Sequence, residues 1–192
     1  MDNIQGKMTR LGNVVVNMHD TAKIVINGEL ICNANLPKGS QKECVLILHE
    51  NSTLIVNNIF KLCYDSVLQI FRGATFILNG GFVNAGAIFG ITRKTTIGDG
   101  FLSARNLVVY DSDHHLILQG KDKKPINYNP QIPVRIGKHV WCGINTTILK
   151  EVVIGDGSII GANSLVSRDI PPRCLAVGNP IKVIKSNVSW RP

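Results

Sequence analysis

The sequence predicts an all-β protein of the solenoid type, in which short strands stack in successive coils. Between Ile136 and Pro171 the chain repeats every sixth residue, in the order IGKHVW, CGINTT, ILKEVV, IGDGSI, IGANSL and VSRDIP. A short fixed period marks a repeat that cannot bury its apolar side alone and has to stack on its neighbours. The repeat does not fit a helical period of about 3.6 residues. Its β-branched residues and glycines instead favour short strands joined by tight turns.

Three positions of the repeat are restricted in residue type. The first is apolar in every repeat: Ile136, Cys142, Ile148, Ile154, Ile160 and Val166. The second is small in five of six repeats: Gly137, Gly143, Leu149, Gly155, Gly161 and Ser167. The fifth is small or β-branched: Val140, Thr146, Val152, Ser158, Ser164 and Ile170. We interpret Cys142 at the first position as a small core residue rather than a nucleophile.

The same frame runs upstream through Ile91, Ile97, Ser103 and Val109, but the two blocks are out of phase. Val109 and the first residue of the second block are 27 positions apart, which is not a multiple of six. The intervening stretch HHLILQGKDKKPINYNPQIP contains Gly, Pro and clustered Lys, so we expect Leu116 to Pro133 to be a loop pushed out of the stack. Long ordered loops are usually functional; a tolerated surface insertion is the alternative.

The first half of the chain is less regular and still predicts strands. KIVINGE at 23–29, VLILHEN at 45–51 and VLQIFRG at 67–73 recur every 22 residues, and STLIVNN at 52–58 and ATFILNG at 74–80 share that spacing. Apolar residues two apart, closed by Gly or Asn, are typical of strands that end in turns. We therefore expect three degenerate coils that continue into the regular ones. A separate N-terminal β domain is the weaker interpretation, because no Ser- or Pro-rich linker divides the halves.

This organisation predicts a single domain over residues 1–192. Residues 1–90 form its degenerate coils, 91–171 its regular coils with loop 116–133, and 172–192 a C-terminal tail. No apolar run is long enough to span a bilayer and the N-terminus does not resemble a secretory signal. Five scattered cysteines without CxxC spacing indicate reduced thiols, so we expect a cytoplasmic protein without membrane insertion.

The net charge of +8 indicates an anionic partner or a solvated basic surface. No basic stretch carries the interleaved aromatic residues that stack on bases, so we do not expect nucleic-acid binding. A polyanionic cofactor or an acidic saccharide explains the charge as well.

The repeats, together with HVWCGINTTIL, IGANSLVSRDIPP and AVGNPIKVIK, resemble the hexapeptide-repeat acyltransferases over about Ile91 to Lys185. The resemblance implies a left-handed parallel β-helix and a homotrimer. It also implies acetyl-CoA as co-substrate, held in a groove between adjacent subunits, and no metal. The DSDHH run and the loop that follows resemble the branch of the family that acetylates sugars.

Candidate chemistry concentrates in Asp111-Ser112-Asp113-His114-His115, where the regular coil ends. Acyl transfer to a hydroxyl needs a base, and histidine suits this role because its ordinary pKa is about 6.5. The family pattern, approximately Ser-Asp-x-His, places His115 in register as the general base, with His114 as the competitor. Asp113 or Asp111 would orient the imidazole.

The resemblance also implies the remaining site residues. Trp141 belongs to the active-site wall, although a residue packing between subunits is an equal interpretation, and backbone N–H groups from Trp141 to Gly143 would stabilise the oxyanion. The residues implied to bind the donor are Gly143, Ile144, Gly161, Ala162, Ser167, Arg168, Lys182 and Lys185. The two lysines would bind the nucleotide phosphates as point charges where the family often has Arg.

The acceptor is predicted as a hydroxyl of a saccharide or of a surface-polysaccharide precursor, contacted by the loop lysines and Tyr128. An amino sugar or another small acceptor is the alternative. A metal-dependent hydratase would need three converging histidines, and neighbouring His114 and His115 would struggle to bind one ion together. A non-enzymatic scaffold is a further alternative, against which the DSDHH and AVGNPIKVIK motifs argue.

Overall fold

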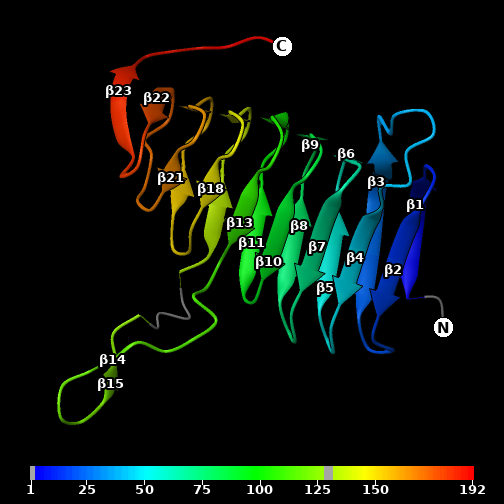
Figure 1. Ribbon diagram of the computed structural model, residues 1–192, viewed down its shortest axis with the longest axis horizontal. Coiled ribbons are helices and arrows are strands. Elements are labelled where there is room, and N and C mark those ends of the chain that lie inside the picture. The colour runs from blue at the N-terminus through cyan, green and yellow to red at the C-terminus, as the bar shows by residue number, and fades with distance from the viewer. Residues whose placement is uncertain (1–2, 128–131) are drawn as a thin grey trace.

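The computed structural model describes residues 3–127 and 132–192, which form a parallel β-helix with three faces (Figure 1). The first face contains β5 (Thr53–Val56), β8 (Thr75–Leu78), β11 (Lys94–Ile97), β16 (Val134–Ile136) and β19 (Val153–Ile154). The second face contains β6 (Ile59–Cys63), β9 (Gly81–Val83), β12 (Phe101–Ser103), β17 (Trp141–Cys142), β20 (Ile159–Ile160) and β22 (Cys174–Val177). The third face contains β2 (Val14–Met18), β4 (Cys44–Leu48), β7 (Ser66–Ile70), β10 (Ile88–Ile91), β13 (Val108–Tyr110), β18 (Thr147–Ile148) and β21 (Leu165–Val166).

The remaining strands lie at the two ends of the helix and in the loop. Strand β3 (Lys23–Ala34) is long enough to pair with both β5 and β6, so it joins the first and second faces. Strand β1 (Ile4–Arg10) pairs with β3 at the N-terminal end, and β23 (Lys182–Ser186) pairs antiparallel with β22 at the other. Strands β14 (Leu118–Gln119) and β15 (Lys124–Pro125) form a short hairpin in the loop. The predicted all-β solenoid is confirmed.

Three hexapeptides make one coil of the regular part. Ile136 pairs with Ile154, and Ile148 pairs with Val166, so residues 18 positions apart lie side by side on one face. Every first-position and fifth-position residue of the repeat is at most 2% exposed, which confirms Cys142 as a core residue. Burial raises the pKa of the Cys142 thiol to about 12, so that the thiolate nucleophile is disfavoured.

The close approach of neighbouring coils explains why the second position of the repeat carries small residues. A Cβ atom on Gly143 would lie 2.6 Å from the backbone nitrogen of Ala162, and one on Gly155 would lie 2.3 Å from that of Pro172. Each glycine therefore allows the next coil to pack directly on its own backbone.

The N-terminal coils confirm two of the predicted pairings and correct the third. Val45 pairs with Val67, and Thr53 pairs with Thr75, as the spacing of 22 residues predicts. The segment 23–29 does not stack on 45–51, because it lies in β3 and pairs with β5 and β6. The strand that precedes 45–48 on the third face is β2, in which Val15 pairs with Val45.

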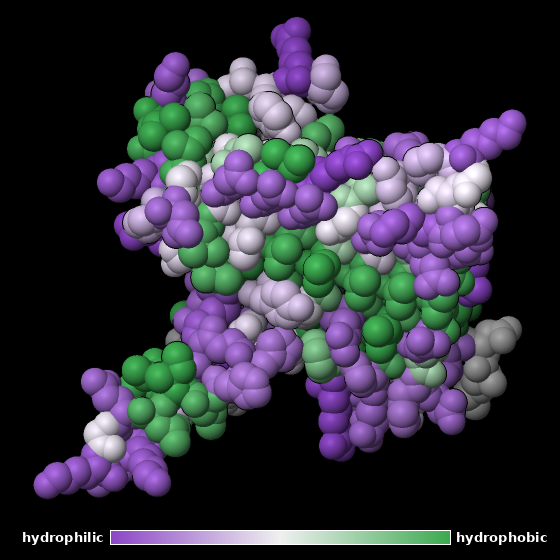
Figure 2. Space-filling model, in the orientation of Figure 1, coloured by the Kyte–Doolittle hydropathy of each residue, from purple (hydrophilic) through white to green (hydrophobic). Residues whose placement is uncertain are grey.

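The loop leaves the helix at the corner where third-face strands end and first-face strands begin, which we call the site corner (Figure 1). Strand β13 ends at Tyr110 and β16 begins at Val134, so the departure starts at Ser112, before the predicted Leu116. Tyr128 lies outside the described residues. Figure 2 shows hydrophobic side chains gathered on the projecting loop. The exposed apolar residues in the described part of the loop are Leu116, Ile117, Leu118, Ile126 and Ile132.

After β23 the C-terminal tail runs back along the helix toward its middle (Figure 1). Trp190 anchors it: its ring stacks on that of His139 with 4.0 Å between centroids, and its Nε1–H donates to the carbonyl of His139 at 2.9 Å. No helix within residues 3–127 and 132–192 is long and apolar enough to cross a membrane.

Candidate active site

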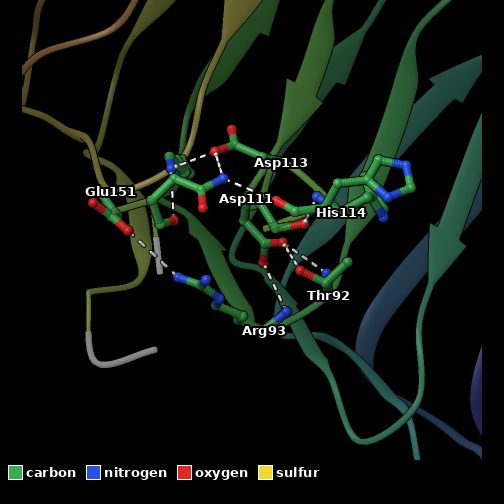
Figure 3. Close-up of polar contacts among 10 residues, drawn as sticks. Thr92, Arg93, Asp111, Asp113, His114 and Glu151 are labelled. Carbon is green, nitrogen blue, oxygen red and sulfur yellow. Dashed lines mark hydrogen bonds and ion pairs between the residues drawn. The ribbon is translucent and has the colours of Figure 1, made fainter. Parts of the chain in front are cut away.

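The carboxylate of Asp111 fastens the site corner to the preceding coil. The side chain is 1% exposed and accepts hydrogen bonds from the backbone N–H and the hydroxyl of Thr92 at 2.7 and 2.8 Å. It also accepts from the backbone N–H of Arg93 at 3.1 Å (Figure 3). The Thr95 hydroxyl donates to it at 3.2 Å. The prediction that Asp111 orients an imidazole is therefore wrong, because both of its oxygens bind the coil below.

Asp113 is bound from the opposite side, by the loop and the next coil. Its Oδ2 accepts a hydrogen bond from the Lys150 ammonium at 2.6 Å and another from the Asn127 amide at 2.6 Å. The hydrogen bond from Lys150 lowers the pKa of Asp113, so that the group stays ionised. The contacts that fix Asp113 do not include the ring of either histidine, so its predicted role in orienting the base stays a prediction.

Replacing Lys150 with methionine should raise the pKa of Asp113 toward its ordinary value, because the ammonium is the main cause of the lowering. A lowered folded-state pKa stabilises the protein above the unfolded pKa of about 3.9, and this stability is lost as the pH falls through the folded pKa. The difference in urea midpoint between wild type and Lys150→Met should thus be present at neutral pH and shrink in acid.

Titration of the Asp113 carboxyl by NMR measures the shift directly. Lys38→Met, at an exposed lysine, is the matched control and should leave the Asp113 titration unchanged. An unchanged pKa in Lys150→Met would contradict the ion pair.

The two histidines lie differently at this corner. His114 has a left-handed backbone (φ +57°), and its ring packs edge-on against Phe71 and Tyr110, with centroids 5.0 and 5.5 Å away. Figure 3 shows this ring turned away from the Asp111 carboxylate. For His115 it is the backbone that is fixed: its N–H donates to the Asp113 carbonyl at 2.6 Å, and its own carbonyl accepts from Asn127 at 2.8 Å.

Both histidines open onto one cavity of about 220 Å³. Its lining residues are Thr92, Arg93, Ser112, Asp113, His114, His115, Leu116 and Asn127. An exposed imidazole on a fixed backbone, beside a cavity of this size, can hold one sugar ring or a similar small acceptor. We call this space the site cavity.

Several residues of the site were not predicted from the sequence. Asn127 ties the loop to its base by bonding both Asp113 and the backbone of His115 and Ile117. Nη1 of Arg93 lies 3.5 Å from Oε1 of Glu151, and the Arg93 side chain is 17% exposed. Lys150 could have been found from the pairing of the coils. Val109 pairs with Ile148, and the same register puts Lys150 beside Asp111 in the next coil. Nothing in the sequence pattern pointed to Asn127.

Trp141 lies elsewhere in the same chain. It is on β17, on the second face, 39% exposed, and lines a different pocket with Leu102, Trp190, Arg191 and Pro192. The ring centroids of Trp141 and Trp190 are 6.0 Å apart. Trp190 is not among the site residues that the sequence predicts. One chain therefore does not bring Trp141 to the histidines.

The predicted donor-binding residues fall into three groups. Gly143, Ile144, Gly161 and Ala162 follow β17 and β20, at the corner between the second and third faces. Ser167 and Arg168 follow β21 and are exposed at the site corner, beyond the histidines. Lys182 and Lys185 are exposed on β23. Their role in binding a donor stays a prediction. Within the described part of the chain, no three His, Cys, Asp or Glu residues are grouped to hold a metal ion.

The chain is similar to known acetyltransferases. Residues 133–168 match the family model described as bacterial transferase hexapeptide (six repeats). A putative acetyltransferase of Staphylococcus aureus strain Mu50 is 50% identical over 58 residues, covering 30% of this chain and 29% of the relative. The polysialic acid O-acetyltransferase of Escherichia coli O1:K1 is 34% identical over 115 residues, covering 52% and 37%.

A solved structure matches over almost the whole chain. The crystal structure of the polysialic-acid-specific acetyltransferase NeuO has a TM-score of 0.70 and 27% identity, covering 98% of this chain and 82% of that one. The chain spans well under half of the two curated relatives named above. The matches confirm the predicted resemblance to the hexapeptide-repeat acyltransferases, and the fold is the left-handed parallel β-helix.

Proposed function

We propose that the protein is an acetyl-CoA-dependent O-acetyltransferase that acetylates a hydroxyl of a saccharide, with His115 as general base. The observation that carries the proposal is the site cavity, where an exposed histidine of the Ser-Asp-x-His pattern opens onto space for a sugar ring. The relatives that are named acetyltransferases support the reaction class. Because acetyl-CoA is a cytoplasmic metabolite, we place the reaction in the cytoplasm.

The chemistry needs no covalent enzyme intermediate. The acceptor oxygen attacks the thioester carbonyl while His115 takes the hydroxyl proton. The tetrahedral oxyanion collapses, the carbon–sulfur bond breaks, and the CoA thiolate leaves and takes the proton from the imidazolium. The predicted oxyanion donors Trp141 and Gly143 are already occupied, because the Trp141 N–H donates to the Ser158 carbonyl at 3.0 Å and the Gly143 N–H to the Ile160 carbonyl at 2.8 Å. Other donors have to stabilise the oxyanion.

The site needs a second copy of the chain to be complete. His115 and Trp141 line separate pockets of one chain, so both can act in one reaction only if a neighbouring chain supplies Trp141. The exposed apolar cluster of the loop supports such a contact, because clustered surface hydrophobics mark interfaces. A closed homotrimer provides three equivalent sites, and its CoA would lie in the groove between chains, against the residues predicted to bind it.

The acceptor is best supported as a saccharide hydroxyl. Both the Escherichia coli relative and NeuO are named for polysialic acid, which is a polymer of sugars. We propose that the acceptor is a surface polysaccharide or its precursor. The loop lysines Lys121, Lys123 and Lys124 would contact this acceptor. An amino-sugar acceptor is the alternative, since an imidazole base serves an amine equally well.

A thiol-release assay with acetyl-CoA tests the proposal. The panel contains sialic acid and its oligomers, neutral hexoses, and glucosamine. Thiol release with a hydroxyl acceptor, and an O-acetyl product by mass spectrometry, is the expected result. Release with glucosamine alone, giving an N-acetyl product, would move the function to amino sugars. Binding of acetyl-CoA without release for any acceptor would leave a non-enzymatic scaffold.

A further inference from the structure

A row of partly exposed aromatic and imidazole rings leads away from the site cavity along the site corner. We call it the ring platform, and it consists of His49, Phe71, Tyr110 and His114. The His49 and Phe71 rings are stacked, with centroids 5.2 Å apart and planes at 8°. His114 packs edge-on against Phe71 on one side and Tyr110 on the other. Residues at the ends of β4, β7 and β13 therefore form one continuous surface, in which Tyr110 and His114 reach across the intervening strand β10 to Phe71.

The coil beneath holds the platform in place. A Cβ atom on Gly90 would lie 2.1 Å from Cε1 of Tyr110, so the tyrosine ring occupies the space that a side chain at Gly90 would fill. Nε2 of His49 lies 3.0 Å from the side-chain nitrogen of Gln69. Phe71, His49 and Tyr110 are half-buried, so each ring is packed on one side and reachable on the other. A surface positioned in this way loses little freedom when a ligand binds.

The platform connects two cavities. His114 belongs to the platform and to the site cavity, and His49 belongs to the platform and to a second cavity of about 460 Å³ toward the N-terminus. The other residues lining the second cavity are Asn17, Met18, His19, Ile47, Leu48, Glu50 and Arg72. Arg72 and Glu50 form an ion pair at 3.2 Å on its rim. The reaction site, the platform and the second cavity thus follow one another along a single corner.

We propose that this corner binds an oligosaccharide of at least three sugar rings, with the platform and the second cavity as subsites next to the reacting ring. The inference rests on the proposed function and specifies its substrate as a chain rather than a monosaccharide. A sugar ring has an apolar face of C–H groups that packs on aromatic rings, and a rim of hydroxyls. The imidazole of His49, the amide of Gln69 and the Arg72–Glu50 pair supply hydrogen-bonding partners for such a rim.

Kinetics with sialic acid and its oligomers of two, three and five units test the proposal. In the wild type, kcat/KM should rise about tenfold from one unit to three, which corresponds to about 1.4 kcal/mol for one additional stacked ring. Phe71→Ala should abolish this rise and leave kcat/KM for the monomer within about twofold. Phe71→Leu keeps the apolar volume without the ring and should show the same loss, which separates stacking from folding.

Tyr64→Ala is the matched control, because Tyr64 is a half-buried aromatic residue at the other edge of the third face. It should retain the dependence on chain length. A wild type that acetylates monomer and trimer equally well, or a Phe71→Leu variant that keeps the rise, would overturn the inference while leaving the transferase function in place.

NMR of the His49 imidazole gives a readout without turnover. Its signals should move on addition of the sialic acid pentamer, and move much less in Phe71→Leu. Movement of these signals without any acetyl transfer would support the subsites and count against the proposed reaction. Absence of movement with the pentamer would overturn the subsites whatever the activity.

Discussion

Replacing His115 with alanine is expected to lower kcat by about 10²- to 10⁴-fold, the usual range for loss of a general base. The backbone of His115 is fixed by Asp113 and Asn127, so the substitution should remove the imidazole and leave the loop in place. KM for acetyl-CoA should change little, because the donor is proposed to lie against other residues. Steady-state kinetics with the acceptor found in the thiol-release assay measures both quantities.

His114→Ala is the matched comparison. The ring of His114 packs against Phe71 and Tyr110, so its loss should affect KM for long acceptors more than kcat. Near-normal kcat in His115→Ala combined with a large loss in His114→Ala would transfer the role of base to His114.

Mixing two inactive variants tests whether the site lies between chains. Random trimers of His115→Ala and Trp141→Ala chains would contain about a quarter of sites with both residues intact, if one chain supplies the histidine and its neighbour the tryptophan. Coexpressed variants should therefore recover activity that neither shows alone. No recovery would place both residues' functions within one chain, or would remove Trp141 from the reaction.

Asp111→Ala should lower the free energy of unfolding by about 3 kcal/mol. The substitution leaves the backbone N–H groups of Thr92 and Arg93 without their acceptor, and buried donors without partners are costly. Because Asp111 lies between β13 and the loop, the loss should also loosen the frame that carries the two histidines. Urea denaturation, followed by circular dichroism, measures the midpoint and the slope.

Two further variants define the origin of this effect. Asp111→Asn keeps the shape and one acceptor oxygen, so it should cost about 1 kcal/mol. Ser112→Ala, at the next position, should leave the midpoint nearly unchanged. If Asp111→Ala were as stable as Ser112→Ala, the carboxylate would not hold the corner.

The regular coils could be predicted from the sequence because every hexapeptide shows the same restriction of residue type at the same positions. The apolar first position and the small second position report burial and coil spacing directly, and both predictions are confirmed at Cys142 and Gly143. The degenerate half carries less information. A two-residue alternation marks a strand but does not say which of the three faces it occupies. The spacing of 22 residues alone therefore places 23–29 on 45–51, whereas 45–48 in fact pairs with β2.

The candidate site could be located but not assembled from the sequence. The DSDHH run identified its place, whereas the partners of its carboxylates depend on register between coils and on the fold of the loop. Asp111 proved to be bound by Thr92 and Thr95, and Asp113 by Lys150, contacts separated by 16 or more positions. The sequence also could not show that Trp141 faces a pocket apart from the histidines.

The length of one turn limits how such a chain can gain or lose material. Since 18 residues return the backbone to the same face, removing a single hexapeptide would carry every later strand round to the adjacent side of the prism. The interior pattern would survive that shift, but the outward side chains would change their neighbours. Additions and deletions that respect function are thus confined to whole turns, or to excursions from a vertex such as the one that begins at Ser112.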